Sequence, residues 1–266
     1  MNTVELELQT ASRLRAAYAG DPIEPFSAAF AGSVEAAYRI QNINTQHAVE
    51  VQGRSIVGRK IGLTSVAVQK QLGVDQPDFG VLFADMRIED SRNDTVAGLL
   101  QPKIEAEIAF GFSRDVTDAD LDVDGLVACI DWIAPALEVV DSRIVDWRIG
   151  IVETIADNAS SGRFVIGSKT AISSESDVVD CEMQLYDGDR VVSSGSGAAC
   201  LGNPFIATLW LARKMVKVGR PIRAGELVLS GALGPMVKVQ KGHTYRATVG
   251  GFGTVSVSFD APAALP

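Results

Sequence analysis

The segment Gln101-Pro102-Lys103-Ile104-Glu105-Ala106-Glu107-Ile108-Ala109-Phe110 is the most informative stretch of this sequence. Apolar residues occupy every second position from Ile104 to Phe110, which is the pattern of a β-strand. The same period places Glu105 and Glu107 on one face, roughly 6.6 Å apart along the backbone. Two neighbouring carboxylates repel each other, and apolar surroundings also remove their solvation. A cation between them would relieve both penalties.

A third acidic residue completes a candidate metal site. Glu138 lies in another strand-like run, Ala136-Leu137-Glu138-Val139-Val140, and with Glu105 and Glu107 it could hold one divalent ion. An all-carboxylate set favours a hard cation, so Mg²⁺ or Mn²⁺ fits better than zinc or copper. Three protein ligands leave positions for water or for a chelating 2-oxo acid. The alternative is that each glutamate is an exposed strand residue, because Glu-x-Glu alone is a weak motif.

Composition limits the classes to which the chain can belong. Its 266 residues are 47% hydrophobic and 21% charged, enough for a full core in one large domain or two modest ones. The net charge of −9 argues against nucleic acid as a partner, since phosphate binding needs a basic surface. The three cysteines show neither a disulfide framework nor zinc spacing. With no signal peptide and no long apolar run, a soluble cytoplasmic protein is expected.

Hydrophobic periodicity predicts an α+β protein that begins with helices. Residues 1–75 are expected to form a small helical N-terminal part, and residues 76–266 a strand-rich body that holds the metal site. Within this body a helix is predicted over Asp122–Ile133. Pro135 is expected to end that helix before the strand of Glu138 begins.

Lys60 and Asp78 are the next candidates for a functional site. Lys60 lies in the strand-like run Ile56–Gly62, flanked by glycines that permit close approach of a ligand. A partly desolvated lysine there could transfer protons or hold an anionic intermediate, although a surface lysine is the simpler explanation. Asp78 lies in a predicted turn, where aspartate is common. Its carboxylate would keep a nearby amine charged.

The loop Asp157-Asn158-Ala159-Ser160-Ser161-Gly162 offers donors that can bind a substrate carboxylate. Ser160 is the candidate substrate-binding residue in it, although the loop is locally indistinguishable from a polar turn. The sequence contains no nucleophile elbow, phosphate loop or zinc-protease helix. His47 and His243 give little support to a catalytic triad.

Together these residues make the chain similar to a known family. It resembles the 2-keto-4-pentenoate hydratases, which belong to the fumarylacetoacetate hydrolase superfamily, over most of its length. One short motif would be weak, but several occur here in the family's order. They are Val57–Thr64, Gly73–Gly80, the Glu105/Glu107 strand, Pro135–Val140, Ala156–Ser160, Trp210–Met215 and Ser230–Met236.

The resemblance implies a mixed β-roll or barrel body with a small helical N-terminal part. It further implies that Glu105, Glu107 and Glu138 bind Mg²⁺ or Mn²⁺, with Lys60 and Asp78 beside the substrate. Members of the family assemble as pentamers or decamers, so a homo-oligomer is expected. An association with a downstream aldolase or with a sister decarboxylase would also fit the family.

The implied reaction belongs to the meta-cleavage degradation of aromatic compounds. 2-Hydroxypenta-2,4-dienoate is ketonised to an α,β-unsaturated 2-oxo acid, and water then adds at C4 to give 4-hydroxy-2-oxopentanoate. A metal held by the 2-oxo acid unit would make C4 electrophilic. Lys60 and Asp78 are the candidates for the proton transfers. Which of them handles which proton is left open.

Several alternatives remain open at this level. 4-Oxalocrotonate (2-oxo-3-hexenedioate) decarboxylase, of the same family, shares the three glutamates and the lysine, but the motif containing Asp78 favours the hydratase. A hydratase of a longer dicarboxylic dienoate would need an added cation, which the sequence does not identify. A superfamily C–C hydrolase would need a catalytic histidine that we cannot place. A non-catalytic pathway scaffold would not need an intact glutamate trio.

Overall fold

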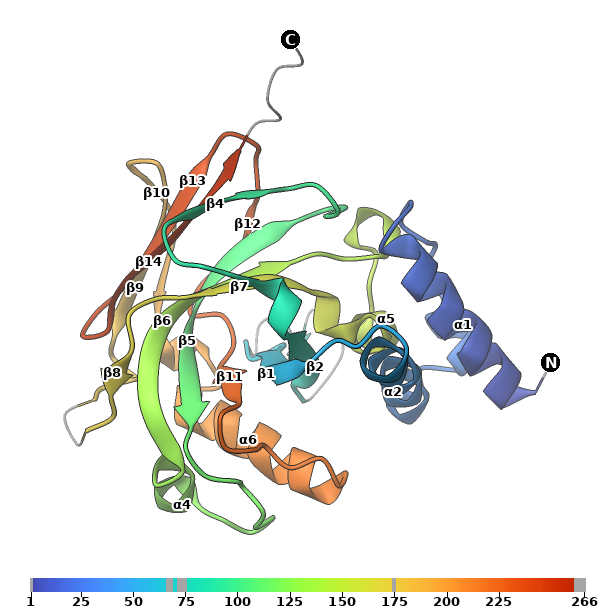
Figure 1. Cartoon of the computed structure of the whole chain (residues 1–266), viewed down its shortest axis with the longest axis horizontal. Helices are drawn as coiled ribbons and strands as arrows, with labels where there is room; N and C mark the ends of the chain where they lie inside the picture. Colours follow the sequence, from blue (N-terminus) through green and yellow to red (C-terminus); the bar gives the residue numbers. More distant parts are fainter. Residues whose placement is uncertain (1, 66–68, 71–75, 174–175, 261–266) are drawn as a thin grey trace.

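The computed structural model describes residues 2–65, 69–70, 76–173 and 176–260. Two β-sheets form the body of the molecule, and helices pack around the larger sheet (Figure 1). The expected α+β class is confirmed, because helices and strands follow one another without a regular βαβ order. The last residues of the predicted N-terminal part, 71–75, lie outside the described residues, as does the start of the Gly73–Gly80 motif.

The larger sheet has the Glu105 segment near its centre. In the part of the chain that the structure describes, its strands follow the order β2-β1-β11-β5-β6-β7-β3, with β12 beside β5 and β8 beside β6. The pairs β1–β11 and β3–β7 are parallel, whereas β5 and β6 are antiparallel. The strands are β1 (Ile56–Gly62), β2 (Asp78–Phe83), β3 (Arg87–Ile88), β5 (Lys103–Phe112), β6 (Ile130–Val140), β7 (Ser161–Ile166), β8 (Thr170–Ala171), β11 (Leu227–Leu229) and β12 (Val237–Lys238).

The smaller sheet packs against the larger one through contacts of β13 and β14 with β6. Its order, over the described residues, is β10-β9-β13-β14-β4. A tight hairpin joins β9 to β10, as the Asp187-Gly188 turn leads one to expect. The strands are β4 (Arg92–Thr95), β9 (Glu182–Asp187), β10 (Arg190–Ser196), β13 (Thr244–Val249) and β14 (Gly253–Asp260).

Three of the helices gather at one side of the larger sheet, where α2 contacts both α1 and α5 (Figure 1). Leu14, Ile40 and Ile155 lie in the small apolar core between them. Among the described residues, no helix combines the length and the apolar character needed to cross a membrane. The helices are α1 (Thr3–Ala17), α2 (Val34–Glu50), α4 (Val123–Val127), α5 (Ile151–Ala156) and α6 (Pro204–Lys217), with short 3-10 turns η1 (Ser27–Phe30), η2 (Ala84–Met86), η3 (Val145–Trp147), η4 (Asn158–Ser160) and η5 (Gly197–Ala199).

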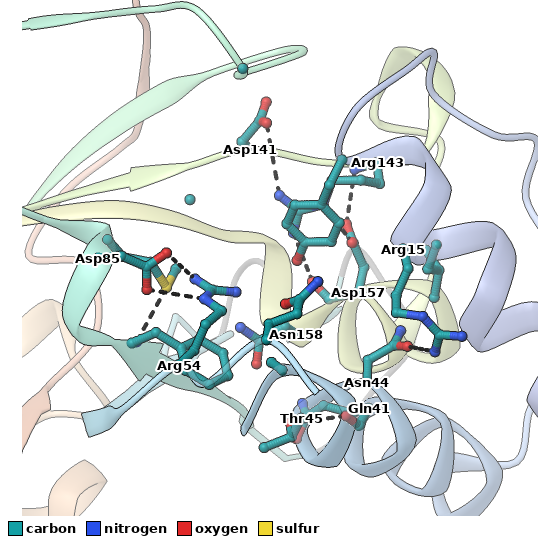
Figure 2. A pocket seen from close by; sticks show the side chains of 18 of the residues that line it. Arg15, Gln41, Asn44, Thr45, Arg54, Asp85, Asp141, Arg143, Asp157 and Asn158 are labelled. Atoms are coloured by element: carbon teal, nitrogen blue, oxygen red, sulfur yellow. Dashed lines mark hydrogen bonds and ion pairs between the residues drawn. The ribbon is translucent and has the colours of Figure 1, made fainter. Parts of the chain in front are cut away.

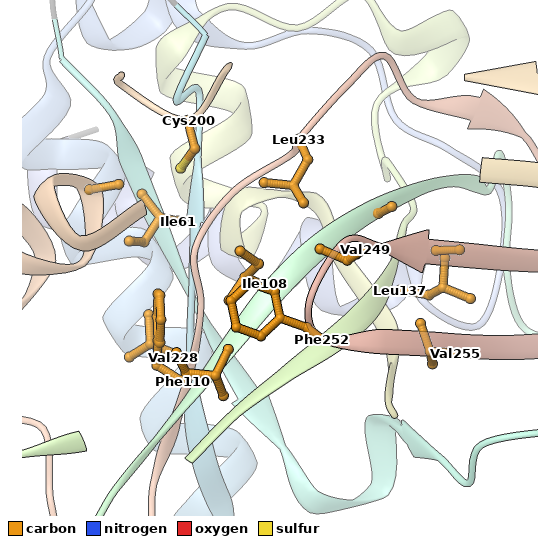
Figure 3. Packing of buried hydrophobic residues seen from close by; sticks show 14 of the residues in the cluster. Ile61, Ile108, Phe110, Leu137, Cys200, Val228, Leu233, Val249, Phe252 and Val255 are labelled. Atoms are coloured by element: carbon orange, nitrogen blue, oxygen red, sulfur yellow. The ribbon is translucent and has the colours of Figure 1, made fainter. Parts of the chain in front are cut away.

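The main hydrophobic core lies on one face of β5. Ile108 and Phe110 are fully buried there, in one cluster with Val228 of β11 and Val255 of the smaller sheet (Figure 3). Because side chains alternate along a strand, the residues between these apolar positions point to the opposite face. Burial of the apolar face therefore fixes the direction in which the glutamates of β5 point.

The helix predicted over Asp122–Ile133 is confirmed at its start, where Asp122 is the N-cap, but its extent to Ile133 is wrong. Helix α4 covers only Val123–Val127, and β6 already begins at Ile130. Pro135, which was expected to end a helix, lies inside β6. The Pro135 carbonyl accepts a hydrogen bond from the Gly167 N–H. Pro135 lies between the residues of β6 that pair with β8 and those that pair with β7. No strand therefore needs the N–H that proline lacks. Long-range pairing with β5 overrides the local helical pattern.

Candidate metal centre

Three glutamates converge on the face of the larger sheet that points away from the main core. Glu105 lies directly opposite Glu138 in the β5–β6 pairing, and Glu107 follows two residues along β5. One carboxylate oxygen of each residue lies within 4.8 Å of those of the other two. Glu107 and Glu138 are fully buried. The structure thus brings together the residues proposed as ligands, and their role as ligands stays a prediction.

Burial raises the pKa values of all three carboxyls. For Glu105 the pKa rises to about 7, because burial and the nearby Glu138 carboxylate disfavour the charged form. The pKa of Glu107 lies well above its ordinary value for the same two causes. The pKa of Glu138 is also raised by burial, although the Lys60 ammonium acts in the opposite direction. With a pKa of about 7, the Glu105 carboxyl would be partly protonated near neutral pH in a protein without a cation at this place.

The hydrogen bonding of the trio is incomplete. Glu107 Oε2 accepts a hydrogen bond from the Gly231 backbone N–H at 2.8 Å. In the described part of the chain, Glu107 Oε1 and Glu138 Oε1 are buried without any hydrogen-bond partner. A buried oxygen that lacks a donor is costly, whereas a hard cation satisfies carboxylate oxygens directly. The unpartnered oxygens therefore fit a site for Mg²⁺ or Mn²⁺.

Lys60 places one positive charge beside the trio. It lies on β1, between β2 and β11, and its Nζ is 3.1 Å from Glu138 Oε2. Its side chain is only 3% exposed. Burial by itself lowers the pKa of Lys60, but the surrounding carboxylates, led by Glu138, outweigh burial and raise it. The single positive charge of Lys60 cannot neutralise three negative carboxylates, and a divalent cation would supply the remaining positive charge.

Asp78 lies close to Lys60 at the start of β2. It pairs with Gly62 of β1 and is almost completely buried. Burial raises the pKa of Asp78 to about 6, although the Lys60 charge and a hydrogen bond from Thr154 counteract it. The Thr154 hydroxyl donates to Asp78 Oδ2 at 3.2 Å, while Oδ1 has no partner among the described residues. The catalytic role of Asp78 stays a prediction.

Gly62 leaves the space that the Asp78 carboxylate occupies. A Cβ at residue 62 would lie 2.1 Å from Asp78 Oδ1, a distance that non-bonded atoms cannot adopt. We expect Gly62→Ala to displace this carboxylate and to lower turnover by about 100-fold, as misplacement of a reacting group does. Steady-state kinetics with thermal melting would measure the effect. Gly20→Ala is the control, because its Cβ meets nothing nearer than 3.5 Å, and equal turnover in the two variants would contradict the expectation.

Ser160 ends a strained turn that contacts β1 and β2. Asn158, Ala159 and Ser160 have φ values of 56°, 52° and 53°, in the left-handed region that residues with a Cβ seldom adopt. Such strain often accompanies functional sites. Ser160 is 3% exposed, and its hydroxyl is buried without a partner in the described structure. That hydroxyl can serve a substrate, and its predicted role in binding one stays untested.

Two side-chain interactions hold this turn in place. The amide of Asn158 accepts from the Val81 N–H at 2.7 Å and donates to the Val81 carbonyl at 2.9 Å, so it continues the hydrogen bonding of edge strand β2. The Arg143 guanidinium, fully buried, donates to the Asp157 carboxylate at 2.6 Å (Figure 2). These contacts fix the strained backbone beside Ser160.

The same turn borders a cavity of about 420 Å³, which residues of α1 and α2 also line (Figure 2). Asn158 and Arg143 line it together with Arg15 and Arg54. Its arginines already have polar partners; Arg54, for example, pairs with Asp85. None of the three glutamates lines this cavity, so it is separate from the candidate metal centre.

Sequence analysis missed two contacts of the site. Thr154 lies in the largely apolar run Ile151–Ala156, where only its hydroxyl distinguishes it from a packing residue. Gly231 lies in a recognised motif, Ser230–Met236, but no pattern indicates that its N–H binds Glu107. Both contacts depend on long-range packing, which a local pattern does not encode.

Comparison with known proteins identifies relatives along most of the chain. Residues 41–259 match the sequence profile described as fumarylacetoacetate (FAA) hydrolase C-terminal. The chain is 49% identical to 2-keto-4-pentenoate hydratase 2 of Dechloromonas aromatica (strain RCB), covering 94% of this chain and 95% of the relative. It is 47% identical to 2-keto-4-pentenoate hydratase of Paraburkholderia xenovorans (strain LB400), covering 98% and 97%.

A solved structure agrees closely with the present one. It is 4-oxalocrotonate decarboxylase from Pseudomonas putida G7 complexed with magnesium and adipate, with a TM-score of 0.91 and 31% identity over 97% of this chain and 99% of the other. A second structure of that decarboxylase is complexed with calcium and acetate. The fold expected from the sequence resemblance is therefore confirmed.

Proposed function

The chain belongs to the fumarylacetoacetate hydrolase family, within its 2-keto-4-pentenoate hydratases, and on this basis we propose that it hydrates 2-hydroxypenta-2,4-dienoate to 4-hydroxy-2-oxopentanoate. This reaction serves the meta-cleavage degradation of aromatic compounds. The observation that carries the proposal is the convergence of Glu105, Glu107 and Glu138 beside Lys60. A trio of this kind suits a substrate with a 2-oxo acid unit, which offers two oxygens to one hard ion.

We propose that Glu105, Glu107 and Glu138 hold Mg²⁺ or Mn²⁺. When bound, the ion supplies Lewis-acid chemistry, which draws electron density from the conjugated 2-oxo acid. The support is the donor set itself: three carboxylates lie together, Glu107 and Glu138 have buried oxygens without a hydrogen-bond partner among the described residues, and Lys60 alone supplies too little positive charge. The related decarboxylase is complexed with magnesium in one structure and with calcium in another.

The chain's own residues would handle the protons and the substrate's charge. Lys60 keeps its proton because carboxylates surround it, so it suits stabilisation of the anionic oxygen that forms during the reaction. Asp78, with a pKa of about 6, can gain and lose a proton near neutral pH. Ketonisation of the dienoate moves a proton from the C2 hydroxyl to C5, and water then adds as hydroxyl at C4 and a proton at C3, so a group that can take up and pass on protons is needed. The Ser160 hydroxyl would donate to the substrate carboxylate.

Metal binding should weaken as the pH falls. The pKa of Glu105 is raised to about 7 in the metal-free protein, so below this pH an incoming cation must displace a proton. Above it, the ionised carboxylate is already available. Calorimetric titration with Mn²⁺ should show affinity rising from pH 6, by up to about tenfold per pH unit for the proton displaced from Glu105, and levelling off towards pH 8. Affinity that does not change over this range would contradict the raised pKa.

Substrate assays distinguish hydration from decarboxylation. The decarboxylase alternative is favoured by one observation, the TM-score of 0.91 to such an enzyme, but the identity to the hydratases is higher, at 49% against 31%. With Mn²⁺ present, we expect loss of dienoate absorbance and appearance of 4-hydroxy-2-oxopentanoate by NMR. Release of CO₂ from 2-oxo-3-hexenedioate without hydration of the pentadienoate would reverse the proposal. Faster hydration of a longer dicarboxylic dienoate would change only the substrate.

We also propose that the protein works as a homo-oligomer. The support is the family resemblance, in which pentamers and decamers occur. Light scattering coupled to gel filtration would measure the mass of the assembly, and a monomer would refute this proposal without affecting the proposed reaction.

A further inference from the structure

We propose that Thr154 is a positioning residue that orients the Asp78 carboxylate so that Oδ1 is the oxygen exchanging protons with the substrate. This inference rests on the proposed function, because it assigns a task to a group of that site. Thr154 itself need not touch the substrate. It acts through one hydrogen bond, from its hydroxyl to Asp78 Oδ2 at 3.2 Å.

The hydroxyl of Thr154 bonds differently from those of Thr45 and Thr208, two other buried threonines in helices. Thr45 and Thr208 each donate to the carbonyl four residues earlier in their own helix, Gln41 and Pro204, both at 2.9 Å. This is the usual partner of a threonine inside a helix. Thr154 is equally buried, at 5% exposure, but its hydroxyl donates across to β2. The side chain of Thr154 thus links α5 to the candidate site rather than to its own helix.

The two oxygens of Asp78 have different surroundings. Oδ2 accepts the Thr154 hydroxyl, while Oδ1 lies over Gly62 and is buried without a partner in the described part of the chain. Gly62 lies two residues from Lys60 on the same strand, β1. Because Asp78 Oδ1 lies over Gly62, this unpartnered oxygen is next to β1. Because side chains at positions of the same parity share a face of a strand, Oδ1 lies on the face from which Lys60 reaches Glu138.

Three features therefore fix the carboxylate. Thr154 occupies Oδ2, the missing Cβ of Gly62 makes room for Oδ1, and the buried surroundings exclude water from both oxygens. A carboxylate that is held at one oxygen cannot rotate freely about its terminal bond. The other oxygen then remains in one place and available for proton transfer, which is the kind of preorganisation that proton transfer requires.

The test compares Thr154→Val, which keeps the shape and removes the hydroxyl, with Thr154→Ser, which keeps the hydroxyl. We expect Thr154→Val to lower kcat by about tenfold, since misplacement of a reacting group slows catalysis strongly. KM and the affinity for Mn²⁺ should stay within about twofold of wild type, since Thr154 is outside the metal site. Thr154→Ser should recover most of kcat. The control is Thr208→Val, which removes an equally buried hydroxyl that bonds only its own helix.

A second measurement separates this inference from the proposed function. Exchange of the C3 protons of 2-oxopentanoate with D₂O, followed by NMR with Mn²⁺ present, needs a group that exchanges protons but no hydration. Thr154→Val should slow this exchange by about tenfold as well. If the wild-type protein exchanges these protons but does not hydrate the dienoate, the proposed substrate is refuted. The exchange rates of the Thr154 variants then decide whether the inference holds. Kinetics of Thr154→Val equal to those of Thr208→Val, or failure of Thr154→Ser to recover activity, would overturn the inference.

Discussion

Glu107→Gln is expected to lower metal-dependent turnover by about three orders of magnitude while the fold remains intact. The substitution keeps the size of the side chain and can still accept the hydrogen bond from Gly231. It removes one of the three charges that attract the cation, and it offers an amide where Glu107 Oε1 now lies unpartnered. Kinetics at several Mn²⁺ concentrations would show whether excess metal restores turnover, which we do not expect.

The stability of this variant gives an independent readout. Burial and repulsion raise the pKa of Glu107, so its ionised form destabilises the metal-free protein as the pH rises. Glu107→Gln removes that penalty, and the metal-free variant should melt above metal-free wild type at pH 8. Added Mn²⁺ should raise the melting temperature of wild type only, because a ligand stabilises the state that binds it.

Glu153→Gln is the matched control for this prediction. Glu153 is equally buried but lies in α5, where its carboxylate accepts backbone N–H groups of Phe26 and Ser27. This control should lose stability and keep its response to Mn²⁺. If Glu107→Gln also kept that response, the trio would not be the metal site.

The metal-site prediction followed from local rules. Glu105 and Glu107 were placed on one face because a strand alternates with period two, and the structure contains that strand. What no local rule supplies is the register, in which Glu105 faces Glu138 across β5 and β6. Register depends on which strands pair, and those strands are far apart in sequence. Glu138 was proposed as the third ligand because it lies in a strand-like run, and the resemblance to a family then supported that proposal.

The errors and omissions have the same physical origin. Leu126 and Ile133 follow helical spacing, yet Ile133 is buried within β6, because pairing with a central strand outweighs a short helical pattern. The contact between Thr154 and Asp78 joins segments that are far apart in sequence. A threonine in an apolar run carries no local sign of such a partner. Sequence patterns predicted which faces of the strands and helices are buried. Predicting the contacts of the site also requires knowing which of these faces pack against each other.

Lys60→Met is expected to lower turnover by about 10²- to 10⁴-fold, the usual range for loss of a group that acts on protons or developing charge. Methionine fills a similar volume in the buried position and carries no charge. The same change removes the cation that now lies 3.1 Å from Glu138. The trio then has a stronger need for an external cation, so affinity for Mn²⁺ should be kept or should rise.

This opposite movement of turnover and metal affinity distinguishes Lys60 from a residue that merely holds the site together. A structural role predicts that both fall, because the trio would lose its arrangement. Lys103→Met is the control, since Lys103 lies near Glu105 on the same strand but places its ammonium 4.0 Å over the Trp147 ring. Its turnover should stay near that of wild type. Loss of Mn²⁺ binding in Lys60→Met would assign Lys60 to the architecture of the site, and normal turnover would remove it from the chemistry.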